Sequence, residues 1–249
     1  AEEMFRTAGL NINAYYAGNL KKELYEAVRK KYINTDSMLV KSSCQTAQAM
    51  GIYFDIFTPA EKHVAFKRLM QIINRDGGRL TCGLIATRII FHVLARYGEA
   101  ETAYKMITDD SFPSYGYYVK IGETALPEHF IQGDYYKRIS HNHHFLGDVQ
   151  QWFMRYLGGI NIINHKKVLI HPIFIEKLSY AEAYHVLPDG EVSVKWQRKG
   201  EGIELAIKCP KSVVCGIELC DGYCFSDNGY TYRDCVPEDK QFKINIIWR

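Results

Sequence analysis

Several features that would assign a function class at once are absent from this sequence of 249 residues. No apolar run approaches the ~20 residues that a membrane-spanning helix needs, and no segment has the pattern of a signal peptide. The strongest basic run, Arg29-Lys30-Lys31, is short, and the formal net charge is +3. Cations at a helix C-terminus complement the helix dipole, so this run predicts a helix end. We therefore expect no nucleic-acid partner and no membrane partner.

Motifs of familiar catalytic and metal sites are also missing. The sequence has no CxxC pair, no HExxH helix and no GxxxxGK[ST] loop, and neither Ser114 nor Ser140 stands in a GxSxG turn. Seven cysteines are present, and the odd number favours a reducing compartment. Four of them form a cluster late in the sequence: Cys215, Cys220, Cys224 and Cys235. This cluster suggests a zinc site or disulfides as alternatives. It falls where short strands are expected, however, and half-buried cysteines are common core residues there.

The composition is that of a soluble globular protein with a real core. Hydrophobic residues make up 47% and charged residues 24%, so the chain is not disordered. Aromatic residues reach 13%, with 18 Tyr. Tyrosine rings cover sugar C–H faces in many binding sites, but they are also ordinary core residues, so composition alone does not decide between the two. The length fits one large or two small domains.

The hydrophobic pattern divides the chain into a helical part and a strand-like part. Up to about Ile160, apolar residues recur at helical spacing, and Thr58-Pro59-Ala60-Glu61 is typical of a helix start with a capping box. Helices are expected at about 20–32, 47–57, 59–76, 83–97, 99–108 and 144–157. After about Lys167, strict alternation at 191–196, 203–208 and 242–246 predicts short strands separated by turn signals. Helices followed by strands indicate two layers or domains, 1–163 and 164–249, the second an antiparallel β-sandwich.

The stretch from Phe112 to Gly147 is the best candidate for a functional site. It is long, polar and aromatic and lacks clear periodicity, and long loops of this kind in compact domains are often functional. His141, His143 and His144 suggest a metal site as one alternative, with Glu128 or Asp148 as a further ligand. Glu123 and Glu128 suggest a second alternative, a pair of carboxylates for acid–base chemistry. The residues alone decide neither.

A set of motifs, in order and spacing, resembles the C-terminal half of the bacterial α-L-rhamnosidases, family 78 of the glycoside hydrolases. The helical part contains Cys44-Gln45-Thr46-Ala47, Gly78-Arg79-Leu80-Thr81-Cys82-Gly83, Phe112-Pro113-Ser114-Tyr115-Gly116-Tyr117, Gly122-x-Thr124-x-x-x-Glu128, Ser140-x-Asn142-His143-x-x-x-Gly147 and Tyr156-Leu157-Gly158-Gly159-Ile160. The strand-like part contains Ile170-x-Pro172 and Gly190-x-Val192-Ser193-Val194-x-Trp196. The resemblance covers nearly the whole chain.

The resemblance implies a partial (α/α)6 toroid with an appended β-sandwich, and hydrolysis of terminal α-L-rhamnose with inversion. An inverting enzyme uses one carboxylic acid to protonate the leaving oxygen and one carboxylate to activate water. The family's base corresponds to Glu128, and its sugar-contacting residues correspond to His143, Asn142 and Tyr115. The resemblance implies no metal and no cofactor, and the partner is a rhamnose-containing glycoside.

The sequence departs from the family at the base and at its beginning. Pro127 stands where the family usually has Trp, which removes an aromatic wall beside Glu128. The sequence predicts about half the helices of a complete ring, so we expect the general acid to lie upstream of Ala1. A chain cut from a ring exposes apolar flanks, and this predicts a homodimer through the cut edge. Two alternatives stay open: a non-catalytic carbohydrate-binding or interaction remnant on the same scaffold, and a related toroid enzyme with another sugar specificity.

Overall fold

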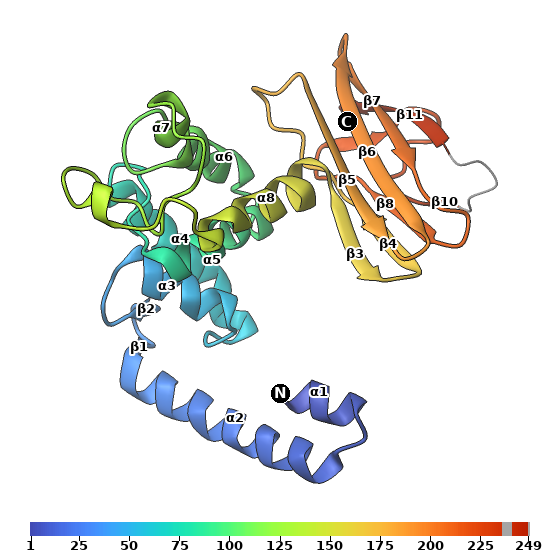
Figure 1. Ribbon diagram of the computed structural model, residues 1–249. Coiled ribbons are helices and arrows are strands. Elements are labelled where there is room, and N and C mark those ends of the chain that lie inside the picture. Colours follow the sequence, from blue (N-terminus) through green and yellow to red (C-terminus); the bar gives the residue numbers. More distant parts are fainter. Residues whose placement is uncertain (236–240, 249) are drawn as a thin grey trace. The chain divides into compact units, whose positions relative to one another are not determined.

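Residues 1–235 and 241–248 are described by a computed structural model, in which helices come first and strands follow (Figure 1). The chain forms two compact units, Ala1–Val93 and Leu94–Arg249. Among the described residues, no helix combines the length and the apolar character that crossing a bilayer requires. The division at 163/164 stays a prediction of the sequence.

The first unit is helical and contains the predicted helices of that region. Its elements are α1 Glu2–Thr7, α2 Asn11–Tyr32, β1 Ile33–Asn34, β2 Leu39–Val40, α3 Gln45–Tyr53, α4 Pro59–Arg75 and most of α5 Leu84–Arg96. The capping box at Thr58 and Glu61 is confirmed, with Pro59 in the first turn of α4. The basic run Arg29-Lys30-Lys31 lies in the last turn of α2, as predicted.

Helix α2 is anchored at its C-terminal end by an ion pair. Its only buried residue is Ala14. Both terminal nitrogens of Arg29 meet the Glu61 carboxylate at 2.8 Å, and one of them also donates to the carbonyl oxygen of Ile56 at 2.7 Å. The Arg29 guanidinium holds the pKa of Glu61 down at about 2. This ion pair ties α2 to the start of α4.

The family motif around Gln45 forms a buried hydrogen-bond network that closes the loop between α4 and α5. The side-chain amide of Gln45 donates to Asp76 Oδ2 and to the carbonyl oxygen of Arg79, at 3.0 and 2.8 Å. Its amide oxygen accepts from the backbone N–H of Thr81 at 3.2 Å. Because Gln45 is fully buried, these partners satisfy a side chain that would otherwise be costly. Gln45 of this motif thus has a structural role, because it holds the loop in place.

The helical part of the second unit departs from the sequence prediction in detail. Its elements are α6 Ala100–Thr108, α7 Tyr115–Lys120, η1 Tyr136–Arg138, η2 His144–Asp148, α8 Val149–Trp152 and η3 Phe153–Leu157. Helix α7 lies inside the stretch expected to lack periodicity, and the Ser114 hydroxyl caps it by accepting from the backbone N–H of Tyr117 at 2.9 Å. The single helix expected over 144–157 changes from 3₁₀ to α to π spacing along its length.

The strands form the predicted sandwich of two sheets. One has the order β10-β8-β4-β3 and the other the order β5-β6-β7-β11-β9. The strands are β3 Ile160–Asn164, β4 Lys167–Ile170, β5 Tyr180–Leu187, β6 Gly190–Lys199, β7 Gly202–Lys208, β8 Val214–Glu218, β9 Tyr223–Phe225, β10 Tyr232–Cys235 and β11 Gln241–Trp248. The three alternating runs lie in β6, β7 and β11, which confirms them. Neighbours are antiparallel except β4 and β8, which pair in parallel.

The sandwich core is made of alternating side chains from both sheets. Val168 and Ile170 of β4 pack in one cluster with Val194 and Trp196 of β6. The indole N–H of Trp196 donates to the carbonyl oxygen of Leu157 at 2.7 Å, which links the sandwich to the end of η3. The late cysteines behave as core residues where they are described: Cys215 and Cys224 are buried and Cys220 packs against the cluster. The Cys235 side chain lies outside the described part of the chain.

Candidate active site

Two short backbone segments that carry the predicted site residues lie side by side. The backbone N–H of Glu128 donates to the carbonyl oxygen of Ser140 at 2.8 Å. The backbone N–H of His143 donates to the carbonyl oxygen of Leu126 at 3.0 Å. Because both bonds join main-chain atoms, the pairing depends on the loop conformation and not on the identity of either side chain. The structure thus brings the Gly122–Glu128 segment and the Ser140–His143 segment together.

Glu128 is half-buried, and the residue before it, Pro127, is buried. Among the residues that the structure describes, no hydrogen-bond donor or cation meets the Glu128 side chain. Glu123 differs, because its carboxylate lies 4.0 Å from His141 Nδ1. A partly shielded carboxylate without a protein donor is free to accept a hydrogen bond from water.

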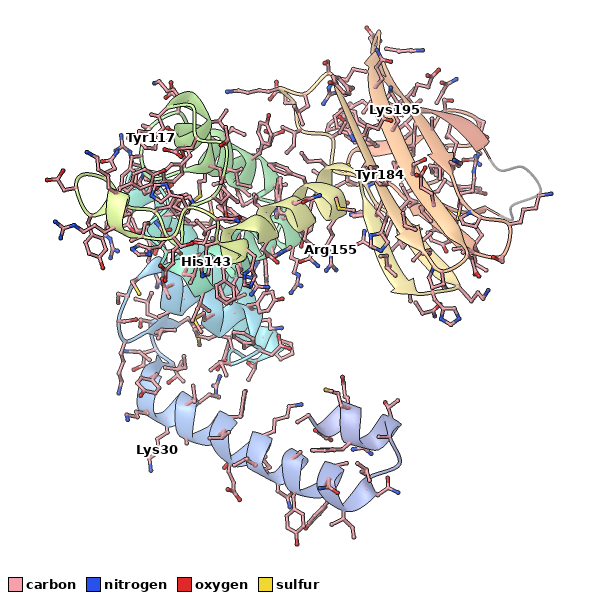
Figure 2. The ribbon with its side chains drawn as sticks, viewed as in Figure 1. Lys30, Tyr117, His143, Arg155, Tyr184 and Lys195 are labelled. Atoms are coloured by element: carbon pink, nitrogen blue, oxygen red, sulfur yellow. The ribbon has the colours of Figure 1, made fainter. Side chains whose placement is uncertain are left out.

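His143, labelled in Figure 2, stands at the N-terminus of η2 with one ring nitrogen engaged. Its Nδ1 accepts from the backbone N–H of Phe145 at 3.5 Å, so the neutral ring carries its proton on Nε2. The ring also stacks on His144, with centroids 5.4 Å apart and an interplanar angle of 8°. This leaves Nε2 as a hydrogen-bond donor. Asn142 beside it is exposed.

Tyr115 lies deeper than the other predicted site residues. It is buried, and its hydroxyl donates to the carbonyl oxygen of Leu146 at 2.9 Å. Its ring meets Phe130 edge to face, with centroids 5.2 Å apart. Burial raises the pKa of Tyr115 well above its ordinary value. In this position Tyr115 supports the loop from within, and its contact with a sugar stays a prediction.

Tyr118 and Tyr136, which sequence reasoning did not single out, form an aromatic cluster with His141 beside these segments. The Tyr136 ring stacks on Tyr118 at 5.8 Å and lies 4.2 Å from the ring of His141. His141 Nε2 is 2.6 Å from the carbonyl oxygen of Tyr136. The Tyr136 hydroxyl is buried beside the Glu123 carboxylate. Burial, and then the Glu123 carboxylate, raise the pKa of Tyr136. The aromatic density of this stretch is the one sequence signal that pointed to such a cluster.

The histidines of the loop have separate partners. His141 faces Tyr136 and Glu123, while His143 faces Phe145 and His144. Within residues 1–235 and 241–248, no group of three or more His, Cys, Asp or Glu side chains is arranged to hold a metal ion.

Helical hairpins followed by a β-sandwich, with a polar aromatic loop late in the helical part, are the architecture of a six-hairpin glycosidase. Two family descriptions match the chain in that order: the bacterial alpha-L-rhamnosidase 6 hairpin glycosidase domain over residues 2–157, and the bacterial alpha-L-rhamnosidase C-terminal domain over residues 164–223. The chain belongs to the bacterial α-L-rhamnosidase family, which confirms the resemblance read from the motifs.

Curated relatives are similar to this chain over most of its length. An alpha-L-rhamnosidase of Alteromonas sp. (strain LOR) is 24% identical over 82% of this chain, and one of Streptomyces avermitilis is 27% identical over 76%. These matches cover 23% and 19% of the two relatives, so the chain spans about a quarter or less of their length.

Solved structures share the fold. An alpha-L-rhamnosidase from Dictyoglumus thermophilum superposes with a TM-score of 0.83 at 24% identity, covering 100% of this chain and 30% of that one. One from Aspergillus terreus gives 0.85 at 21% identity, covering 98% and 28%. The Streptomyces avermitilis enzyme, solved in complex with L-rhamnose, gives 0.81 at 22% identity, covering 99% and 24%. The predicted fold class, a partial helical toroid followed by a β-sandwich, is confirmed.

Proposed function

We propose that this chain is the C-terminal part of an inverting α-L-rhamnosidase, with Glu128 as general base. The observation that carries the proposal is the backbone pairing of the Glu128 and His143 segments. It gives Glu128, the candidate base, and His143, the candidate sugar-contacting residue, a common backbone support. The names of the curated relatives supply the substrate class, a glycoside that ends in α-L-rhamnose.

The chemistry asked of Glu128 is removal of a proton from the attacking water. In an inverting hydrolase the base and the acid stand on opposite faces of the sugar, roughly 6.5–9.5 Å apart, which leaves room for that water. A half-buried carboxylate without a protein donor suits this role, because it can hold the water by hydrogen bonding. The matching acid then belongs to a part of the toroid outside this chain.

Recognition of the sugar falls to the Ser140–His143 segment and the aromatic residues beneath it. His143 offers its Nε2–H to a sugar hydroxyl, and Asn142 can both donate and accept. Tyr115 contributes through the ring that supports the loop. Neither this recognition nor the acid–base step calls for a metal or a cofactor.

The test uses the full-length parent and an aryl α-L-rhamnoside. Glu128→Gln removes the base and keeps the shape, so kcat should fall by roughly 10²–10⁴-fold, with the unfolding midpoint unchanged. Asp134→Asn is the matched control, since Asp134 is an exposed carboxylate of the same loop. NMR of the first product should show the inverted anomer. Near-wild-type turnover of Glu128→Gln, or a retained anomer, would overturn the proposal.

A further inference from the structure

The outer face of β5 and β6 presents two tyrosine rings in a regular arrangement. Tyr180 and Tyr184 are 59% and 63% exposed and point to the same side of β5. Because they are four residues apart in one strand, their rings are roughly 13–14 Å apart along it. Directly across on β6, Tyr180 is paired with Gln197 and Tyr184 with Ser193. Each ring therefore has an uncharged hydrogen-bonding side chain as its neighbour.

Neither tyrosine side chain makes a polar or ring contact that would hold the fold together. Within the part of the chain that the structure describes, no hydrogen bond or ring contact engages the side chain of Tyr180 or Tyr184. The opposite side of β5 fixes the strand, because Ala183 approaches Gly158 so closely that a Cβ on that glycine would lie 2.3 Å from the Ala183 Cβ. The rings thus stand on a strand whose position is set by packing on its other face.

Charges on this face neutralise one another. Glu182 of β5 meets Lys195 of β6 at 3.1 Å, and it lies between the two tyrosines (Figure 2 labels Tyr184 and Lys195). On the same face, Glu191 of β6 pairs with Lys208 of β7 at 3.6 Å, and Lys199 of β6 pairs with Glu204 of β7 at 3.2 Å. A face with paired charges attracts neither an anion nor a cation, so its ligand is expected to be uncharged.

A groove of about 830 Å³ runs beside the same strand. It is lined by residues 177–186, by Tyr104 of α6 and by Phe153 and Met154 of η3. An elongated ligand lying over Tyr180 and Tyr184 would have this groove along its flank.

We propose that the outer face of β5 and β6 binds a neutral oligosaccharide, with sugar rings stacked on Tyr180 and Tyr184. Tyrosine rings cover the C–H faces of sugars, and the Gln197 and Ser193 side chains supply hydrogen bonds to hydroxyls. The separation of the rings requires an oligosaccharide, because a single sugar reaches one ring only. The proposal rests on the proposed function for its ligand, the glycan chain whose terminal rhamnose is removed elsewhere on the protein.

The test is titration of the 249-residue chain with an uncharged L-rhamnan hexasaccharide. Calorimetry measures the Kd, and two-dimensional NMR locates the binding surface. Backbone signals of β5 and β6 should shift. Tyr180→Ala and Tyr184→Ala should each raise Kd by roughly three- to tenfold, whereas Tyr184→Phe, which keeps the ring, should stay within about twofold. Tyr230→Ala is the matched control, because Tyr230 is 68% exposed but lies in the turn before β10. Each variant should unfold at the wild-type temperature.

Several outcomes would overturn the proposal. They are a wild-type chain that does not bind the hexasaccharide, equal losses in Tyr184→Ala and Tyr230→Ala, and shifts confined to residues 122–145. Binding of an extended peptide along the free edge of β5, with no glycan binding, would assign the strand to protein recognition instead. A failure of the proposed function can be distinguished from a failure of this glycan-binding proposal. Glu128→Gln should keep hexasaccharide binding, and Tyr184→Ala in the full-length parent should keep hydrolysis of a small aryl rhamnoside.

Discussion

The backbone N–H of Glu128 donates to the carbonyl oxygen of Ser140 at 2.8 Å. This one bond, with its companion from His143 to Leu126, makes two separate sequence motifs into one support for side chains. Because main-chain atoms form it, replacing the side chain of Glu128 or His143 should leave the loop pairing intact. Changes in activity then report on the side chains themselves.

His143→Ala should raise KM in the full-length parent, because an Nε2–H that donates to a sugar hydroxyl is lost. Loss of one such bond to an uncharged hydroxyl is worth about 1 kcal/mol, or roughly fivefold. His144→Ala is the control, since His144 is exposed and contributes its ring to the stack. Elemental analysis should find no bound zinc in either protein. Stoichiometric zinc that disappears in His143→Ala would contradict the assignment to sugar binding.

In the proposed function the isolated chain carries the base without its acid, so it should not hydrolyse an aryl rhamnoside. General acid–base assistance is worth roughly 10²–10⁴-fold, and the rest of the toroid would also supply much of the sugar pocket. Activity assays on the purified chain check this. Measurable turnover would place the acid within these residues, with Glu123 the first candidate.

The isolated chain should also self-associate through α2. This helix exposes a row of large apolar side chains, namely Ile12, Tyr15, Tyr16, Leu20 and Leu24. Contiguous apolar surface of more than a few hundred Å² usually finds a partner. Light scattering should detect a dimer, and the double substitution Leu20→Glu with Leu24→Lys should shift it toward monomer. Val119→Glu is the control, at an exposed apolar residue of α7. A monodisperse monomer in the wild type would contradict the predicted self-association.

Acid should weaken the first unit through Glu61. The Arg29 ion pair lowers the pKa of Glu61 from 4.5 to about 2. A carboxylate with a lowered folded-state pKa stabilises the fold above its unfolded value, and this stabilisation is lost as pH falls from about 4.5 towards about 2. Glu61→Gln should therefore cost about 1–3 kcal/mol at pH 7, and the cost should shrink across that window. Urea unfolding at several pH values measures it. Asp55→Asn, at an exposed partner of Lys62, should cost much less. Equal costs would show that the Arg29 contact is of no special importance.

The paired glycines after η3 are predicted to be needed for close packing. Gly159 has a φ of 76°, and a Cβ there would lie 2.3 Å from the backbone nitrogen of Pro172. Gly159→Ala should lower the free energy of unfolding by about 2–4 kcal/mol, from backbone strain and overpacking together. Gly200 is the matched control, because its φ is 58° but nothing lies within 4 Å of an added Cβ. Gly200→Ala should therefore cost only about 1–2 kcal/mol. Similar losses at both positions would assign the effect to φ alone.

Some of the fold and part of the candidate site could be predicted from sequence because their causes are local. The capping box at Thr58 and Glu61 is complete within four consecutive residues, so it fixes the start of α4 without other parts of the chain. Strict alternation in β6 and β7 reports one buried face in the same way. Glu128 and His143 were found through a resemblance of ordered motifs, and no local rule singled them out.

Other elements could not be predicted because their causes lie far away in the sequence. Helix α7 is short, and its Tyr118 side chain bonds the Ile131 backbone, a contact that no periodicity signals. Strand β5 alternates too, but its apolar Tyr180 and Tyr184 face outward, so the pattern of hydrophobic residues does not mark the buried face. The parallel pairing of β4 with β8 joins strands that turns do not connect.

The sequence by itself determined the order of a helical and a β part, the helix ends set by caps, and the family through its motifs. Only the tertiary structure decided that Glu128 and His143 share one loop support, that Tyr136 packs against His141, and that Tyr180 and Tyr184 lie on one face beside paired charges. The physical reason is the separation in sequence over which each effect acts. Propensity, capping and alternation act between residues a few positions apart, whereas a site is made by packing and hydrogen bonds between segments that meet only after the chain has folded.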